Sequence, residues 1–231
     1  MPRATAGHFT PELFRFLTQL ERNNDREWFE KNRRRYLEHV RDPMLRFIAD
    51  FAPRLARISP HFVADPAPVG GSMFRIHRDI RFSKDKRPYK TAATARFPHE
   101  RGKSVHTPGW YLHLSPDGVY VGSGIWHPDA PTLTRIRRAI VDGAAAWKRV
   151  KQHRALRAGH EWSGDSLKRP PRGFDPAHPF ARDLMRKDIV TFAELDERAA
   201  CSAGFIDRVT TLCRGSAPLV RFLCGALELE Y

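Results

Sequence analysis

The chain has 231 residues, of which 41% are hydrophobic and 29% charged, a composition typical of a folded globular protein rather than a disordered one. Its formal net charge of +14 favours anionic partners, although an Arg-rich composition can also raise the net charge without any function. No apolar run approaches the roughly 20 residues of a membrane-spanning helix, and the N-terminus lacks the apolar stretch of a secretory signal, so we expect a cytoplasmic protein without a membrane partner.

The first 60 residues are predicted to form helices. Thr10-Pro11 is typical of a helix start, and Asp25 can cap a second helix. Asp42-Pro43 repeats the first signal before a run of apolar residues at intervals of three and four. A connector rich in Pro and Gly follows, and residues 1–8 are expected to be a flexible N-terminus.

The hydrophobic periodicity then changes from the roughly 3.6-residue period of a helix to the two-residue period of a strand. Residues 73–82 alternate between apolar and polar side chains and are predicted to form a strand, followed by a charged loop and a second strand at Thr91–Pro98. The segment "GWYLHLSPDGVYVGSGIW" predicts a hairpin that turns at Ser115–Gly118. The polar face of the first strand would carry Arg75, His77, Asp79 and Arg81.

The second half of the chain returns to helical patterns around one more strand. We predict a helix at 129–150, a long Pro/Gly loop at 164–179 and a strand at Ile189–Leu195. Two helices, around Gly204–Cys213 and Pro218–Leu227, are expected to end the chain.

Segregated helices and strands place the chain in the α+β class. We expect a central antiparallel β-meander at about residues 73–126 plus the later strand. The N-terminal and C-terminal helices should cover one face of this sheet, because its other face is too polar to pack dry. The whole of 9–231 is expected to be a single domain.

Half of the net charge is concentrated in one short region. Residues 70–106 contain ten Lys or Arg and three acidic residues, a net charge of +7. Guanidinium groups about 6–7 Å apart on one strand face can grip a phosphate or carboxylate from two sides. We therefore predict an anion site, with Asp79 and Tyr89 orienting its cations and a second basic loop reaching the same face. The candidate ligand-binding residues are Arg75, Arg78, Asp79, Arg81, Lys84, Lys86, Tyr89 and Lys90, with Lys168, Arg169 and Arg172 from the second loop.

Several alternatives to a small anionic ligand remain open. The charged residues of the strand could instead form a salt-bridge ladder. Nucleic acid could bind the basic cluster and stack on Trp110, Tyr111, Tyr120 or Trp126, although no nucleic-acid-binding motif is present. An acidic protein partner is a further possibility, and the oligomeric state is left open.

Catalysis is the alternative from a different class. His77 and Asp79, together with His113, could supply acid–base chemistry on a phosphorylated substrate. The sequence contains no nucleotide-binding loop, nucleophile elbow or dinucleotide fingerprint, and the spacing of its three cysteines matches no zinc pattern. We therefore predict neither a cofactor nor a metal, and the sequence does not establish whether the protein is an enzyme.

Three segments carry a resemblance to a known family. The motifs "NNDREWFEKNRRRY", "RDIRFSKDKRPYKT" and "LKRPPRGFDPAHP" occur in this order, with "GGSMFRI", "PGWYLHL" and "GSGIWHP" between the first and the last. Over about residues 9–227 the chain resembles domain-of-unknown-function family 2461, which occurs in bacteria and fungi. The resemblance implies one intact domain and supplies no activity.

Overall fold

The computed structural model describes residues 7–102 and 106–231, so most of the predicted flexible N-terminus, residues 1–8, lies outside the described residues. The predicted α+β class is confirmed. The helices are α1 (Pro11–Arg22), α2 (Arg26–Tyr36), the π-helical turn η1 (Leu37–Arg41), α3 (Asp42–Ala56), α4 (Ala130–Asp142), α5 (Ala144–Gln152), α6 (Arg154–Gly159), α7 (Ala181–Leu184), α8 (Glu197–Ala200) and α9 (Phe205–Ala226). The assignment of 9–231 to a single domain stays a prediction.

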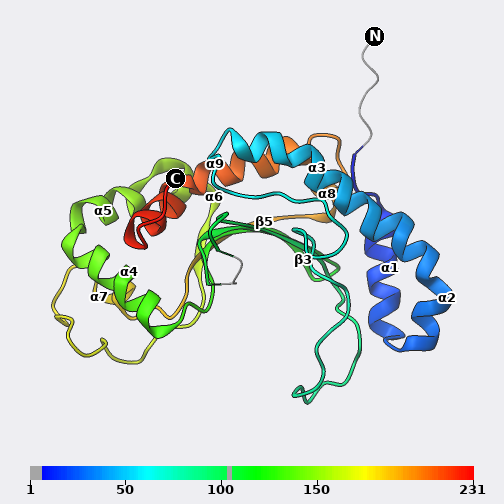
Figure 1. Ribbon diagram of the computed structural model, residues 1–231, viewed down its shortest axis with the longest axis horizontal. Helices are drawn as coiled ribbons and strands as arrows, with labels where there is room; N and C mark the ends of the chain where they lie inside the picture. Colours follow the sequence, from blue (N-terminus) through cyan, green and yellow to red (C-terminus); the bar gives the residue numbers. More distant parts are fainter. Residues whose placement is uncertain (1–6, 103–105) are drawn as a thin grey trace, which may run out of the picture.

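The strands form one antiparallel sheet in the order β1-β2-β3-β5-β4. They are β1 (Ala93–Pro98), β2 (Gly109–Ser115), β3 (Gly118–Ile125), β4 (Glu161–Ser163) and β5 (Ile189–Leu195). The predicted hairpin and later strand are confirmed, whereas β4 is too short to leave a pattern in the sequence. The sheet arches so that one face is convex and the other concave (Figure 1).

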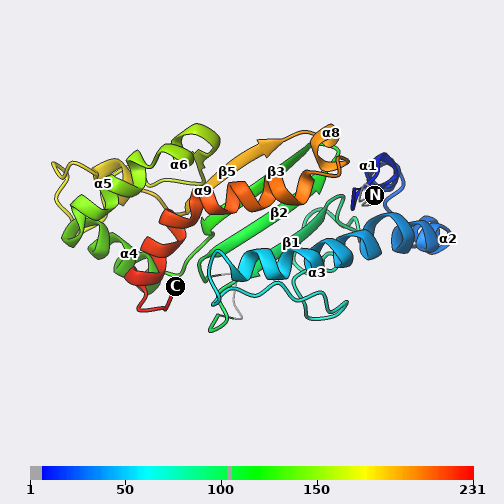
Figure 2. The same ribbon diagram turned by 90° about the horizontal axis from the view of Figure 1, so that it is seen from above.

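The convex face carries the apolar half of the strand alternation. Trp110, Leu112 and Leu114 of β2 are buried on this side, and α3 and α9 lie across it (Figure 2). The indole Nε1 of Trp110 donates to the hydroxyl of Ser216 on α9 at 3.0 Å, so even the polar atom of this side chain is used within the core. The prediction that helices cover one face only is confirmed.

The predicted strand at 73–82 is wrong. Its first residues pair with β1, where Phe74 N donates to Thr94 O at 2.9 Å. The chain then leaves the sheet, and His77 forms an isolated bridge with Tyr89 of the same segment, at the point where the chain comes back toward β1. Beyond this bridge, Asp79 and Asp85 accept from the backbone N–H two residues further on, at 3.3 and 3.0 Å. Such aspartate turns compete with strand pairing, so the segment forms a protruding loop.

Two helical predictions also need correction. The C-terminal pair is one helix, α9, which continues through Pro218. A proline inside a helix costs about 3 kcal/mol, and here the helix stays intact where Ser216, Leu219 and Val220 are buried around it. The predicted helix at 129–150 is instead split into α4 and α5 at Gly143.

Among the described residues, no helix combines the length and the apolar character that crossing a bilayer would require.

The burial of the convex face can be tested at Leu112, whose side chain is fully buried beneath the helices. Leu112→Ala should lower the free energy of unfolding by about 2–5 kcal/mol, because it leaves a cavity in the core. Val69→Ala, at a residue that is 89% exposed, should change it by less than about 0.5 kcal/mol. Urea denaturation measures both variants, and equal small losses would contradict the burial of this face.

Candidate functional site

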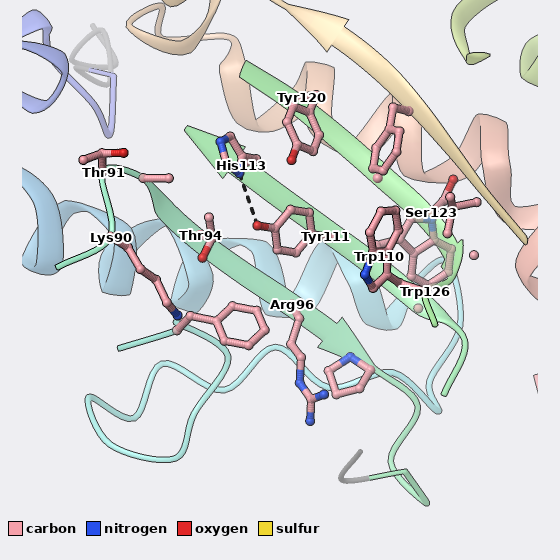
Figure 3. A pocket seen from close by; sticks show the side chains of 18 of the residues that line it. Lys90, Thr91, Thr94, Arg96, Trp110, Tyr111, His113, Tyr120, Ser123 and Trp126 are labelled. Atoms are coloured by element: carbon pink, nitrogen blue, oxygen red, sulfur yellow. Dashed lines mark hydrogen bonds between the residues drawn. The ribbon is translucent and has the colours of Figure 1, made fainter. Parts of the chain in front are cut away.

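A hollow of about 690 Å³ lies on the concave face of the sheet (Figure 3). Its lining comes from β1, β2, β3 and β5 and from the segment that precedes β1. Five of the lining residues, Arg96, Tyr111, His113, Tyr120 and Phe192, alternate with buried neighbours on their strands, so their side chains belong to the face that the helices do not cover. The polar half of the alternation thus builds the walls of the site.

Glycines keep the floor of the hollow open. Gly109 of β2 and Gly124 of β3 lie opposite each other in the sheet, and Gly122 lies opposite Tyr111. A Cβ on Gly124 would stand 2.0 Å from the carbonyl oxygen of Ile189, and its φ of +118° favours glycine. These positions bring bare backbone to the surface of the hollow, as occurs where a ligand approaches a sheet closely.

Aromatic rings form a continuous arc across the hollow. Phe74 lies 6.2 Å from Tyr111, which lies 6.0 Å from Tyr120. The arc continues from Tyr120 to Phe192 at 5.0 Å, and from Phe192 to Trp126 at 6.4 Å, all between ring centroids. It therefore reaches from the segment before β1 to Phe192 on β5 and to Trp126, the residue that follows β3.

His113 and Tyr111 form a polar pair within this arc. The hydroxyl of Tyr111 lies at hydrogen-bond distance, 3.2 Å, from Nδ1 of His113, whose ring stacks on Tyr120 at 4.5 Å. Burial raises the pKa of the Tyr111 phenol and lowers the pKa of the His113 imidazole, although Asp117 opposes the second shift. Both groups are therefore neutral at pH 7, and each can donate or accept one hydrogen bond.

The charged lining of the hollow is mainly positive. Four basic side chains, Arg78, Arg87, Lys90 and Arg96, line it, and Asp85 is the single carboxylate among the described residues that do so. Asp85 accepts from Arg78 at 2.6 Å and from Arg87 at 2.8 Å, which hold the pKa of its carboxyl well below the usual range. The lining thus has a net charge of +3, and its one carboxylate is already bound.

Lys90 is a sequence-predicted cation whose side chain lines the hollow. Its ammonium lies 5.1 Å from the centroid of Phe74. Burial, followed by the nearby charge of Arg75, lowers the pKa of Lys90. Within residues 7–102 and 106–231 no carboxylate lies within ion-pair distance of this ammonium, so an anion in the hollow would offset a desolvated charge.

The structure brings together only part of the predicted basic site. Arg78, Tyr89 and Lys90 line the hollow, whereas the remaining candidates of the same segment do not. These other residues are Arg75 and His77, which stand where the segment leaves the sheet, and Asp79, Arg81, Lys84 and Lys86 on the protruding loop. The predicted row on one strand face does not exist, because the strand is absent.

The expectation that the second basic loop reaches the same face is wrong. Lys168, Arg169 and Arg172 lie on the 164–179 loop beside α5 and α7, at the opposite end of the molecule from the 70–91 segment (Figures 1 and 2). None of the described residues lining the hollow comes from this loop. Helices α4 to α6, inserted between β3 and β4, carry the loop away from β1.

Arg96 and Phe192 are two of the lining residues that sequence reasoning missed. Arg96 stands on the polar side of the alternation in β1, between buried Ala95 and Phe97, and this signal could have found it. Phe192 is apolar and gives no such signal, because only the register of β5 against β3 places it opposite Gly122.

Comparison with known families gives one result. A family model described as "Conserved hypothetical protein (DUF2461)" matches residues 12–222. The chain belongs to this DUF2461 family. No curated protein and no solved structure matches the chain, so the comparisons supply no activity or ligand.

Two of the sequence motifs that resemble the DUF2461 family meet in the structure. Asn24, from the first motif, donates to Tyr89 O and accepts from Tyr89 N, each at 3.0 Å. The ring of Phe29, from the same motif, stacks on Tyr89 at 4.1 Å. The N-terminal helices thereby hold the base of the basic loop beside the hollow.

No cluster of three or more His, Cys, Asp or Glu side chains is placed to hold a metal ion in the described part of the chain. The arrangement in the hollow instead offers cations, neutral hydrogen-bonding groups and ring faces.

The burial of His113 predicts a pH dependence. Because the folded protein binds this proton less tightly than the unfolded chain, His113 lowers stability as pH falls below its unfolded pKa of about 6.5. Urea denaturation should therefore show a smaller loss of stability from pH 7.5 to 5.5 in His113→Gln than in the wild type. His153→Gln, at an exposed histidine, is the control and should match the wild type; the same slope in all three proteins would contradict the burial.

Proposed function

We propose that this protein binds an anionic small molecule, phosphate-bearing or carboxylated, in the hollow on the concave face of its sheet, and we expect it to do so in the cytoplasm. The observation that carries the proposal is the charge of the lining, with four basic side chains and a single carboxylate that two of them already occupy. Lys90 and Arg96 are the proposed ligand contacts.

The size of the hollow favours a small molecule over nucleic acid. Its volume of about 690 Å³ is within the ~300–1,000 Å³ typical of small-molecule sites. A backbone-binding surface would instead need cations spread along the path of a strand. The exposed cations Arg75, Lys84 and Lys86 belong to the same segment as Lys90 and do not line the hollow, so they would attract an anion toward it rather than orient it.

Arg81 has less support as a ligand contact than the sequence suggested. It donates to both oxygens of Asp79, at 2.9 and 2.6 Å, and this pairing lowers the pKa of the Asp79 carboxyl. The same pairing weakens the alternative of acid–base catalysis at His77 and Asp79, because a carboxylate engaged by a guanidinium is a poor proton acceptor. An acidic protein partner for the outer loop and nucleic acid are the remaining alternatives.

Binding can be measured by calorimetric titration with a panel of phosphorylated and carboxylated metabolites and their uncharged analogues. We expect at least one anion to bind in the micromolar range. The double variant Lys90→Gln/Arg96→Gln should raise its Kd about 100-fold or more, since each charge-assisted hydrogen bond contributes about 1.5–3 kcal/mol.

The matched control is Lys168→Gln/Arg169→Gln, which removes the same charge from the distant loop and should change the Kd less than about twofold. Equal losses in the two double variants, or no binding by any anion of the panel, would overturn the proposal. Salt provides a further check, because an oligonucleotide held through its phosphates would lose affinity by orders of magnitude between about 50 and 200 mM salt. Tight oligonucleotide binding that survives Lys90→Gln/Arg96→Gln would favour the nucleic-acid alternative.

A further inference from the structure

We infer that the ligand of the hollow is a planar ring system joined to an anionic group, with the ring held at the β3–β5 side and the anion at the β1 side. This inference rests on the proposed function and adds the class and orientation of the ligand. It follows from the way charges and rings are distributed across the strands.

Cations and the outer aromatic rings occupy opposite sides of the hollow. Lys90 and Arg96 come from β1 and the residues before it, whereas Tyr120 and Trp126 come from β3 and the turn that follows it (Figure 3). Arg96 and Phe192 share one row of the sheet, separated by β2 and β3. At about 4.8 Å between strands this row spans roughly 14 Å, a length suited to a ring with an attached acidic group.

The arrangement of rings on the aromatic side of the hollow favours a planar ligand. Phe192 meets Tyr120 at an interplanar angle of 75° and Trp126 at 57°, so neighbouring rings offer faces in different directions. The ring of Phe192 packs over Gly122, where a Cβ would stand 2.8 Å from it, so this ring lies close to the sheet. A planar ligand can therefore stack on one ring and meet the edge of another.

Trp126 adds a second, independent observation. Its side chain lines the hollow, yet the residue remains 46% exposed instead of being covered by a helix. Trp162, by contrast, is covered at 4.1 Å by the ammonium of Lys151. An exposed indole at the mouth of a hollow supplies a large rigid surface that a ring can cover at little cost in side-chain entropy.

The side chains in the middle of the hollow suit a polar group that joins the ring of the ligand to its anionic group. Tyr111 and His113 stand on β2, between the strands that carry the cations and the outer rings; the phenol is neutral at pH 7, and burial lowers the pKa of the imidazole and favours its neutral form. They can donate to or accept from ester, hydroxyl or ring heteroatoms of the ligand without adding charge. The three zones of the lining thus follow the order of anion, polar link and ring.

The experiment compares three probes by calorimetric titration. 2-Naphthyl phosphate carries both ring and anion, cyclohexyl phosphate carries the anion without a planar ring, and 2-naphthol carries the ring without the anion. We expect 2-naphthyl phosphate to bind at least tenfold more tightly than either of the others. Trp126→Leu should reduce its advantage over cyclohexyl phosphate to threefold or less, and should leave the Kd of cyclohexyl phosphate within about twofold.

Phe82→Leu is the matched control, because this aromatic residue is 94% exposed on the outer loop and does not line the hollow. It should preserve the full advantage of 2-naphthyl phosphate. Circular dichroism checks that each variant is folded, and Phe192→Leu repeats the test should Trp126→Leu not fold.

The possible failures are distinguishable. If the two phosphates bind equally and Lys90→Gln/Arg96→Gln weakens both, the ring inference is overturned while the proposed function stands. If 2-naphthol binds as tightly as 2-naphthyl phosphate, and the charge variant affects neither, the anionic part of both proposals is wrong. Failure of 2-naphthyl phosphate to bind overturns the ring inference, whatever the metabolite panel gives.

Discussion

The strict alternation of side chains along β1, β2, β3 and β5 is the constraint on which both faces of this protein depend. One set of residues, such as Leu112 and Leu114, is buried beneath α3 and α9, and the interleaved set, such as Tyr111 and His113, faces the hollow. Because the period is two, a slip of one residue would exchange the sets and expose the core. Burial of the convex face therefore also fixes which residues line the concave face.

The pairing of Asn24 with Tyr89 links the N-terminal helices to the segment that lines the hollow before β1. Its two backbone hydrogen bonds, with the stacking of Phe29 on the same tyrosine, attach the basic loop to the N-terminal helices. The following residue, Lys90, is thereby positioned at the edge of the hollow. The helices thus contribute to the site through backbone position, although α1, α2 and α3 supply none of the described residues that line it.

Periodicity predicted the fold where local pattern and burial agree, and failed where side chains satisfy the backbone locally. The β2–β3 hairpin and β5 follow their sequence patterns closely. Residues 73–82 have an equally regular alternation, but Asp79 and Asp85 bind neighbouring N–H groups and end the pairing. The opposite happens at Pro218, where a local helix-breaking signal is overridden by tertiary burial of the helix around it. Neither outcome can be derived from periodicity alone, because each depends on a competing set of hydrogen bonds or contacts.

The candidate site was only partly predictable because counting charges does not say which charges are already neutralised. Arg81 and Lys90 contribute equally to the +7 of their region, yet Arg81 is bound to a carboxylate two residues away while Lys90 lies against an aromatic ring. The difference is electrostatic. A guanidinium already paired with a carboxylate in solvent binds a further anion only weakly, whereas a partly buried ammonium without a carboxylate partner is stabilised most by a bound anion. The cations of a basic segment are therefore best ranked as candidate ligand contacts by their distance to the nearest carboxylate and by their burial. By these two criteria the basic residue of this segment that matters most is Lys90, at the point where the loop rejoins the sheet.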